Sequence, residues 1–186
     1  MSRDVSVVGG IYHERCLQPQ WDQVFGSAGR AACAISGIAS GRVQLRGYAH
    51  RSLRDRIAFE ADLNDVELAI EDMSQAITFD YVHTLSVPII SPSTPLLKQL
   101  PAIHADNRVV IRYGMIESDA VVCADVAIYD PQSAFGAKPF RHNGSSADRL
   151  AIVLNRLEMQ SITGTNNPRE GAEWLACPYE VVRFQF

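Results

Sequence analysis

The chain has 186 residues, 47% hydrophobic and 20% charged, a composition that fits a globular protein and excludes the collagen-like, disordered and coiled-coil classes. Its formal net charge of −4 has no long run of either sign, so we expect no nucleic-acid partner. No stretch approaches the roughly 18 apolar residues of a membrane span, and the first residues do not resemble a signal peptide. We therefore expect no membrane partner and a cytoplasmic location.

Strand-like and helix-like segments alternate from the N-terminus. An apolar run over residues 5–9 predicts a buried strand, which ends at the glycine pair Gly9 and Gly10. Residues 26–38 are rich in glycine and alanine and predict a helix. Residues 42–48 alternate in hydropathy, which predicts a second strand.

A helix is predicted to begin at Asn64. Glu67 follows three residues later, as in a capping box. Apolar residues then recur at helical spacing, at Val66, Ile70, Met73 and Ile77. We interpret this stripe as core.

Prolines divide the middle of the chain. Residues 81–85 predict a strand, and the prolines that follow predict a surface segment with a short helix over residues 96–100. Further strands are predicted over residues 108–113, 120–123 and 126–129. The last leads into the turn Asp130-Pro131-Gln132, which places polar groups at the carboxyl end of a strand.

The C-terminal part continues the alternation. Residues 150–154 predict a strand that leads into Asn155, and the helix that follows ends at Gly164 in a C-cap position. Residues 168–176 predict a helix with proline at its first position, and residues 180–186 predict a final strand. The whole pattern predicts a single α/β domain over residues 1–186, with a mainly parallel sheet flanked by helices.

In an open α/β sheet the ligand crevice lies beyond the carboxyl ends of the strands. Polar or glycine residues that fall at such ends are therefore candidates for a site. They are Gly10, Glu14, Gly26, Gly29, Asp130, Asn155 and Glu158.

Four short segments carry a resemblance to a known family. In chain order they are the strand ending at Gly9-Gly10, Gly26-Ser27-Ala28-Gly29-Arg30-Ala31-Ala32, Tyr129-Asp130-Pro131-Gln132, and Leu154-Asn155-Arg156-Leu157-Glu158 followed by Ile162-Thr163-Gly164. In this order they resemble the PfkB-type (ribokinase-like) carbohydrate kinases, and the NxxE pattern of the last segment is the most specific part. The resemblance implies a ribokinase-like, Rossmann-like fold. It also implies ATP-dependent phosphoryl transfer to a hydroxyl of a sugar or nucleoside, with Mg²⁺.

The resemblance places the substrate at the start of the first helix. It assigns substrate binding to Glu14, Gly26, Ser27, Gly29 and Arg30. Tight packing of helix on sheet is the alternative for the glycines, and a solvated loop acid is the alternative for Glu14. Ser27 and Ala31 stand in a stretch where the family usually has two adjacent glycines and an asparagine, so the identity of the sugar stays open.

The resemblance assigns Asp130, Asn155 and Glu158 to binding of nucleotide and phosphate. Glu158 would hold Mg²⁺ indirectly, through water, which suits a hard cation that keeps much of its hydration. Asn155 and Glu158 lie one helical turn apart. The alternative is a helix cap, in which Asn155 is the N-cap and Glu158 its N3 partner.

The family also has a late GAGD-like segment that supplies an anion hole and the catalytic base. No Gly-x-Gly-Asp occurs in these 186 residues. We therefore expect a C-terminally truncated kinase fold, inactive as an isolated chain, whose open final strand is covered by a second copy or a partner. The alternative is a noncatalytic remnant that binds a small ligand or a partner.

Two further site types have weaker support. His83 and Ser86 are three residues apart, but a Ser-His-Asp hydrolase needs a GxSxG elbow, which the chain lacks. His13 and Cys16 have no second ligand pair nearby, so we expect no metal site there. The four cysteines, Cys16, Cys33, Cys123 and Cys177, show no CxxC spacing, and we expect reduced thiols.

Overall fold

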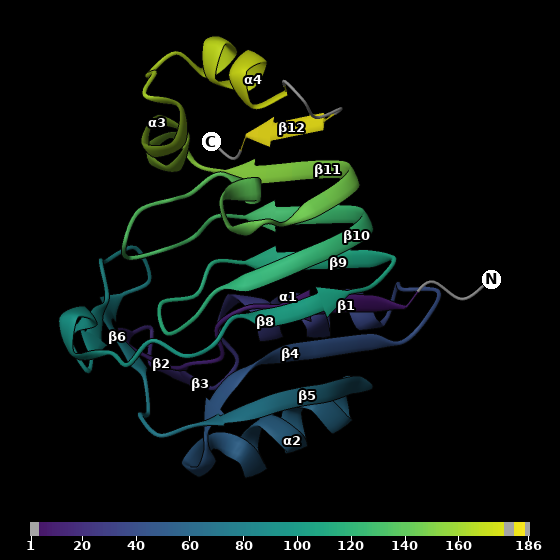
Figure 1. Cartoon of the computed structure of the whole chain (residues 1–186). Coiled ribbons are helices and arrows are strands. Elements are labelled where there is room, and N and C mark those ends of the chain that lie inside the picture. The colour runs from purple at the N-terminus through teal and green to yellow at the C-terminus, as the bar shows by residue number, and fades with distance from the viewer. Residues whose placement is uncertain (1–3, 177–180, 185–186) are drawn as a thin grey trace.

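A parallel sheet of eight strands organises the molecule (Figure 1). The computed structural model describes residues 4–176 and the strand at residues 181–184. The main path of the sheet is β12-β11-β10-β9-β1-β4-β5, β8 pairs with β10, and every pairing is parallel. The strands are β1 (Val5–Val8), β4 (Val43–His50), β5 (Val66–Met73), β8 (Ile103–Asp106), β9 (Val109–Tyr113), β10 (Ala120–Asp130), β11 (Ser146–Leu154) and β12 (Val181–Phe184). This confirms the predicted α/β fold with a mainly parallel sheet.

Helices α1 (Gly26–Ser36) and α2 (Arg54–Leu63) cover one face of the sheet at the β1–β4–β5 end. Ala28 and Ala32 of α1 are fully buried, and their small side chains let the helix approach β1 and β4 closely. The predicted helix over residues 26–38 and the predicted strands over residues 5–9 and 42–48 are therefore confirmed in outline.

The helix predicted from Asn64 is wrong. The eight residues of β5, Val66–Met73, pair in register with the eight of β4, and the helix is instead α2, which ends at Leu63 with Asn64 as its C-cap residue. The Asn64 side-chain amide donates to the Glu60 carbonyl, so this asparagine closes a helix and does not open one. β5 lies at the edge of the sheet and buries only Val66 and Met73 fully, so its burial shows none of the alternation that reveals a strand in sequence.

The sheet curls strongly at β10. The segments predicted as separate strands, residues 120–123 and 126–129, form one strand whose first part pairs with β8 and whose second part pairs with β9. Parallel neighbours need a crossover of about a dozen residues. Here the first part of β10 is part of the crossover that connects β9 with the second part of β10. Figure 1 shows β10 folding back over the sheet. Val110 and Val122 are both fully buried in the resulting core.

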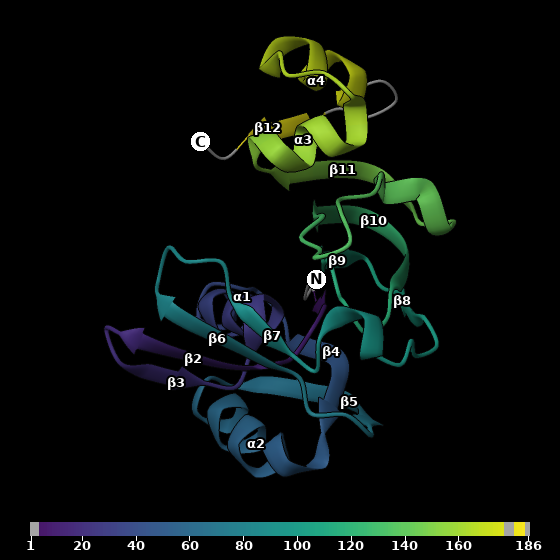
Figure 2. The ribbon, with the colours of Figure 1, turned by 90° about the vertical axis from the view of Figure 1, so that its left-hand side faces the viewer.

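A second, four-stranded sheet stands to one side of the first (Figure 2). It has the order β3-β2-β6-β7, with β2 (His13–Gln18), β3 (Trp21–Gln23), β6 (Thr78–His83) and β7 (Ile89–Ser91). Only β6 was predicted, over residues 81–85, and the structure moves it towards the N-terminus. The chain enters this sheet after the carboxyl ends of β1 and β5, so the sheet stands next to the edge where the crevice was predicted.

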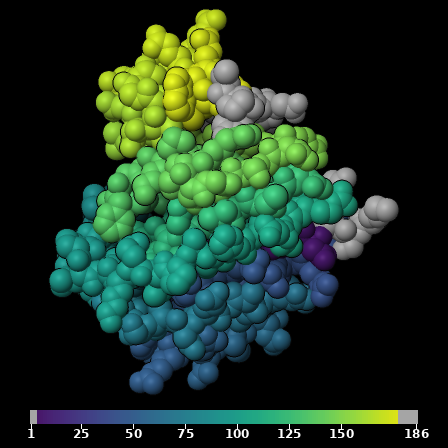
Figure 3. All heavy atoms as spheres, in the orientation of Figure 1, coloured from purple at the N-terminus to yellow at the C-terminus, as the bar shows by residue number. Residues whose placement is uncertain are grey.

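Helices α3 (Arg156–Thr163) and α4 (Pro168–Ala176) close the C-terminal end and form the yellow end of the space-filling view (Figure 3). Both were predicted, and Gly164 takes the left-handed C-cap conformation, with φ of +76°. The predicted helix over residues 96–100 is replaced by a 3-10 turn at Thr94–Leu96. Two further 3-10 turns are Arg51–Leu53 and Phe140–Asn143. The final strand is described over Val181–Phe184, whereas Cys177 and the ends of the predicted range 180–186 lie outside the described residues.

No helix among the described residues is both long and apolar enough to cross a membrane.

Candidate functional site

A cavity of about 140 Å³ lies at the carboxyl edge of the main sheet, between α1 and the second sheet. Four of the predicted residues line it, namely Gly10, Glu14, Ser27 and Arg30. The other residues that line it are Tyr12, Ala28, Phe79, Tyr81, Tyr113, Gly114, Ile116, Gln132, Ser133 and Ala134. We call it the acceptor cavity, because the family resemblance leads us to expect the substrate at the start of α1. Of the seven residues predicted from strand ends, Gly10 and Glu14 line this cavity and the other five do not.

Glu14 is a buried acid held by an arginine. It belongs to β2, only 5% of it is exposed, and its carboxylate accepts a hydrogen bond from Arg30 Nη1. It is therefore not a solvated loop acid. Burial raises the pKa of the neighbouring Tyr81 hydroxyl, the Glu14 carboxylate adds to this effect, and the Arg30 guanidinium opposes it. The cavity thus combines a carboxylate, a guanidinium and an aromatic hydroxyl in a small space.

The two predicted glycines of α1 pack against their neighbours and do not line the cavity. Gly26 has φ of +60°, and a Cβ there would lie 2.6 Å from the Gly10 carbonyl oxygen. A Cβ at Gly29 would lie 2.4 Å from the Phe25 side chain. Gly26 therefore matches the packing alternative, whereas Gly29 packs against Phe25, the N-cap residue of its own helix. Gly26 still brings the start of α1 against the Gly9-Gly10 end of β1, and Ser27 and Arg30 depend on that placement.

A path of hydrogen bonds leads from the cavity to the acidic edge of the sheet. Arg30 Nη2 donates to Ser27 Oγ at 3.4 Å, and Ser27 Oγ donates to Gln132 Oε1 at 3.0 Å. Gln132 Nε2 then donates to Asp130 Oδ2 at 3.1 Å, and the Gln132 backbone N–H donates to Asp130 Oδ1 at 3.3 Å. Gln132 therefore connects the predicted substrate residues with Asp130.

Asp130 and Glu158 form an acidic edge at the carboxyl ends of β10 and β11. Burial and, second, the Glu158 charge raise the pKa of Asp130 to about 6, and the two Gln132 hydrogen bonds oppose this effect. The two acids therefore disfavour each other's charged form at this place. A divalent cation would relieve this repulsion.

Asn155 and Glu158 form a complete capping box at the start of α3. Asn155 Oδ1 accepts from the backbone N–H groups of Leu157 and Glu158 at 2.9 and 3.0 Å, and Glu158 Oε2 accepts from the Asn155 N–H at 2.8 Å. The cap alternative is therefore present. Glu158 Oε1 is not used by the cap, so capping leaves one carboxylate oxygen for a ligand.

Sequence reasoning missed the wall of the acceptor cavity. The Tyr12 ring stacks on Phe79 with 4.8 Å between centroids, and its hydroxyl donates to Glu117 Oε2 at 2.6 Å. Burial raises the pKa of Glu117, which is 1% exposed, although the Tyr12 hydrogen bond favours its charged form. Tyr12 and Glu117 are 105 positions apart, so no local spacing could have joined them.

The hydrolase and the His13 metal site do not assemble. Ser86 Oγ donates to the His83 carbonyl and accepts from the N–H groups of Val82 and His83, which makes it a turn-forming serine. His13 Nε2 lies 2.9 Å from Asp22 Oδ2. Within residues 4–176 no group of three or more His, Cys, Asp and Glu side chains is placed to hold a metal ion.

Comparison with known proteins identifies the class of fold. No protein-family model matches the sequence, and no curated protein matches it. Among solved structures, a pyrophosphate-dependent kinase of the ribokinase family, complexed with a pyrophosphate analogue and myo-inositol, has a TM-score of 0.61 and 12% identity, with 98% of this chain and 72% of that chain covered. Adenosine kinase from Sinorhizobium meliloti has a TM-score of 0.61 and 10% identity, covering 99% and 75% of the two chains. Phosphofructokinase-2 from Escherichia coli, in its tetrameric inhibited form, has a TM-score of 0.53 and 8% identity, covering 98% and 73%.

These likenesses define a ribokinase-like fold, which confirms the predicted fold class. The neighbours that share it are kinases of sugars, cyclic polyols and nucleosides.

Proposed function

We propose that the chain is a carbohydrate-kinase-like protein whose acceptor cavity binds a small polyhydroxy compound. The observation that carries this proposal is the hydrogen-bonded path from Glu14 and Arg30 through Ser27 and Gln132 to Asp130. It joins a polar cavity to an acidic edge, and phosphoryl transfer needs both an acceptor site and a place for the charged donor. The fold neighbours, which include a myo-inositol complex, support the same class.

The size of the acceptor cavity favours a small acceptor. Its volume of about 140 Å³ is below the roughly 300–1,000 Å³ of pockets for drug-sized ligands. A sugar or cyclic polyol suits this space better than a nucleoside, which carries a base as well as a sugar. Glu14 keeps capacity to accept hydrogen bonds from two acceptor hydroxyls, because Arg30 uses only one of about four lone-pair sites of the carboxylate.

Within the proposal, ATP or another phosphate donor and Mg²⁺ belong at the acidic edge. Asp130 and the Glu158 oxygen that the cap does not use would hold Mg²⁺ through its waters, and a bound cation would favour the charged form of Asp130, which burial and Glu158 disfavour. The cation would neutralise donor phosphates and bring them towards the acceptor. The hydrogen bond between Ser27 and Gln132 fixes the position of the acceptor cavity relative to this edge.

The second candidate is a noncatalytic protein that binds a small ligand or a partner. These 186 residues contain no Gly-x-Gly-Asp, the segment that by the family resemblance supplies an anion hole and a base, so this candidate concerns the 186 residues by themselves. Loss of an anion-hole donor alone costs about 3–4 kcal/mol of transition-state stabilisation. We therefore expect the 186-residue chain to bind the acceptor without appreciable turnover. Under both candidate functions, we expect a second copy of the chain or a partner to cover the edge strand β12.

The proposal is tested by separating binding from turnover. Calorimetric titration with myo-inositol, ribose, fructose and adenosine should detect binding of at least one polyol, weakened about tenfold or more by Glu14→Gln, because a neutral amide is a poorer acceptor. Glu60→Gln, an exposed change on α2, should leave affinity unchanged. A coupled ADP-release assay should show no acceptor-dependent turnover.

Two results would contradict the proposal. The proposed acceptor site would be refuted if no polyol bound, or if Glu14→Gln left the affinity unchanged. Sustained turnover abolished by Glu158→Gln would instead show a working kinase and refute the expected inactivity.

A further inference from the structure

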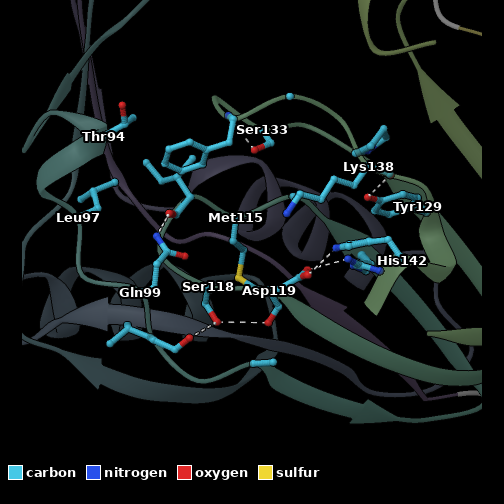
Figure 4. A pocket seen from close by; sticks show the side chains of 18 residues that line it. Thr94, Leu97, Gln99, Met115, Ser118, Asp119, Tyr129, Ser133, Lys138 and His142 are labelled. Carbon is cyan, nitrogen blue, oxygen red and sulfur yellow. Dashed lines mark hydrogen bonds and ion pairs between the residues drawn. The ribbon is translucent and has the colours of Figure 1, made fainter. Parts of the chain in front are cut away.

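A second and larger cavity, of about 490 Å³, opens next to the acceptor cavity (Figure 4). Three loop segments surround it, over residues 94–102, 114–119 and 131–142, with Arg112 and Tyr129 at its base. None of the predicted site residues lines it, and it shares only Gly114, Ile116 and Ser133 with the acceptor cavity. Its volume lies within the roughly 300–1,000 Å³ range of ligand pockets. We call it the loop cavity.

The acid in this cavity is already neutralised. Asp119 Oδ1 accepts from Arg112 Nη2 at 2.7 Å and from the Ala120 N–H at 2.8 Å. Asp119 Oδ2 accepts from Asn143 Nδ2 at 2.9 Å and lies 3.0 Å from His142 Nε2. Burial alone would raise the pKa of Asp119, but Arg112 and these hydrogen bonds together hold it below its usual value. Asp119 therefore does not repel an anion in this cavity.

Arg112 is fixed beneath the cavity. Only 2% of it is exposed, and its guanidinium lies 4.6 Å from the centroid of the Tyr129 ring. Nη1 donates to Ser145 Oγ and to the Phe140 carbonyl, both at 3.1 Å, while Nε is buried with no partner among the described residues. The positive charge of Arg112 is thus buried next to the cavity. Its carboxylate partner, Asp119, also contacts His142.

Two donors face the cavity without partners of their own. Lys138 reaches into it, as Figure 4 shows, and its ammonium makes no hydrogen bond or ion pair with any residue in the described ranges. Ser133 Oγ accepts from the Phe135 N–H at 3.1 Å, and its own hydroxyl hydrogen has no acceptor within the described part of the chain. The chain has only two lysines, against fifteen arginines, and Lys98 does not line the cavity.

Apolar side chains form part of the rest of the wall. Leu97 and Met115 are 8% and 7% exposed, and Phe135 stands at the mouth with about half its surface exposed. A ligand that fills this space therefore needs an apolar or ring-shaped body as well as a group that the Lys138 ammonium can bind.

We propose that the loop cavity is a binding site for a small organic anion, with its phosphate or carboxylate held by Lys138 and Ser133 and its body packed on Met115 and Leu97. Arg112 is paired with Asp119, so the Lys138 ammonium is the positive charge in the lining that has no partner among the described residues. This site is independent of phosphoryl transfer in the acceptor cavity and stands whether or not the chain is a kinase.

The test uses the whole 186-residue chain and three probes that share a ring: phenyl phosphate, benzoate and phenol. We expect calorimetric titration to show binding of an anion at millimolar concentration or below and no binding of phenol. Lys138→Gln should weaken the anion about tenfold, which corresponds to one charge-assisted hydrogen bond. Lys98→Gln is the matched control and should leave affinity unchanged. The tighter of the two anions identifies the head group.

A second measurement does not depend on a variant folding. Lysines are acetylated in the native chain and the labelled peptides are quantified by mass spectrometry, with and without phenyl phosphate. Protection of Lys138 with unchanged labelling of Lys98 supports the site. Equal labelling of Lys138 in both conditions, equal affinity of phenol and the anions, or anion binding unaffected by Lys138→Gln would overturn it.

Discussion

Asp130 should make the stability of this protein fall as the pH rises through the acid range. Its pKa is raised from 3.8 to about 6 in the folded chain, chiefly by burial and then by Glu158. A carboxyl with a raised folded-state pKa stabilises the fold fully below its unfolded pKa, and that stability is lost as the pH rises through the folded pKa. The full difference corresponds to about 3 kcal/mol, of which about 1.4 kcal/mol remains at pH 5 and almost none at pH 7.5.

The perturbation is Asp130→Asn, which keeps the shape and an acceptor for the Gln132 N–H but cannot titrate. Urea unfolding should be measured at pH 5 and pH 7.5 in the presence of a chelator, so that no divalent cation shields the site. We expect the wild-type chain to lose about 1.4 kcal/mol more than the variant between the two pH values. Shared contributions from other acids, including Glu117, cancel in this comparison.

Asp62→Asn is the control, because Asp62 is an exposed acid on α2. It should keep the pH dependence of the wild type. Glu158→Gln should remove only part of the effect, since burial is the larger cause of the raised pKa. Parallel pH dependence in wild type and Asp130→Asn would refute the reasoning.

Two further predictions concern local structure. Asn155→Ala should lower the free energy of unfolding by about 1 kcal/mol, because two backbone N–H groups of α3 lose their acceptor. Glu158→Gln retains a capping partner and should lower the free energy of unfolding by less. Equal losses for the two variants in urea unfolding would contradict this prediction. Gly114→Ala should cost about 3 kcal/mol or more and close both cavities to ligands, because its Cβ would lie 1.5 Å from the Gln132 carbonyl oxygen. Gly37→Ala meets nothing within 4 Å and should be neutral or slightly stabilising by the same assay.

The sequence predicted those elements whose hydrogen bonds or apolar pattern depend only on residues close together in the chain. The α3 capping box needs only Asn155 and Glu158, three residues apart, and both hydrogen bonds are present. The run at residues 5–9 is apolar apart from Ser6, as expected of a strand buried on both faces, and β1 lies between β4 and β9. Of the expected site residues, Gly10, Glu14, Ser27 and Arg30 line one cavity, because strand ends and helix starts meet at one edge of a parallel sheet. The other expected residues, Gly26, Gly29, Asp130, Asn155 and Glu158, do not line it.

The tertiary structure alone decided what depends on distant partners. Residues 66–73 carry a spacing that suits a helix, yet eight backbone pairings with β4 make them a strand. The second sheet, the fold of β10 over its own sheet and the contact between Tyr12 and Glu117 all join segments with no local signal. Gln132 joins α1 to Asp130 across 105 positions. Sequence spacing therefore determined caps, buried runs and strand ends. The cavities depend on tertiary structure, because they form where loops that are distant in sequence meet and each loop is buried by its neighbours.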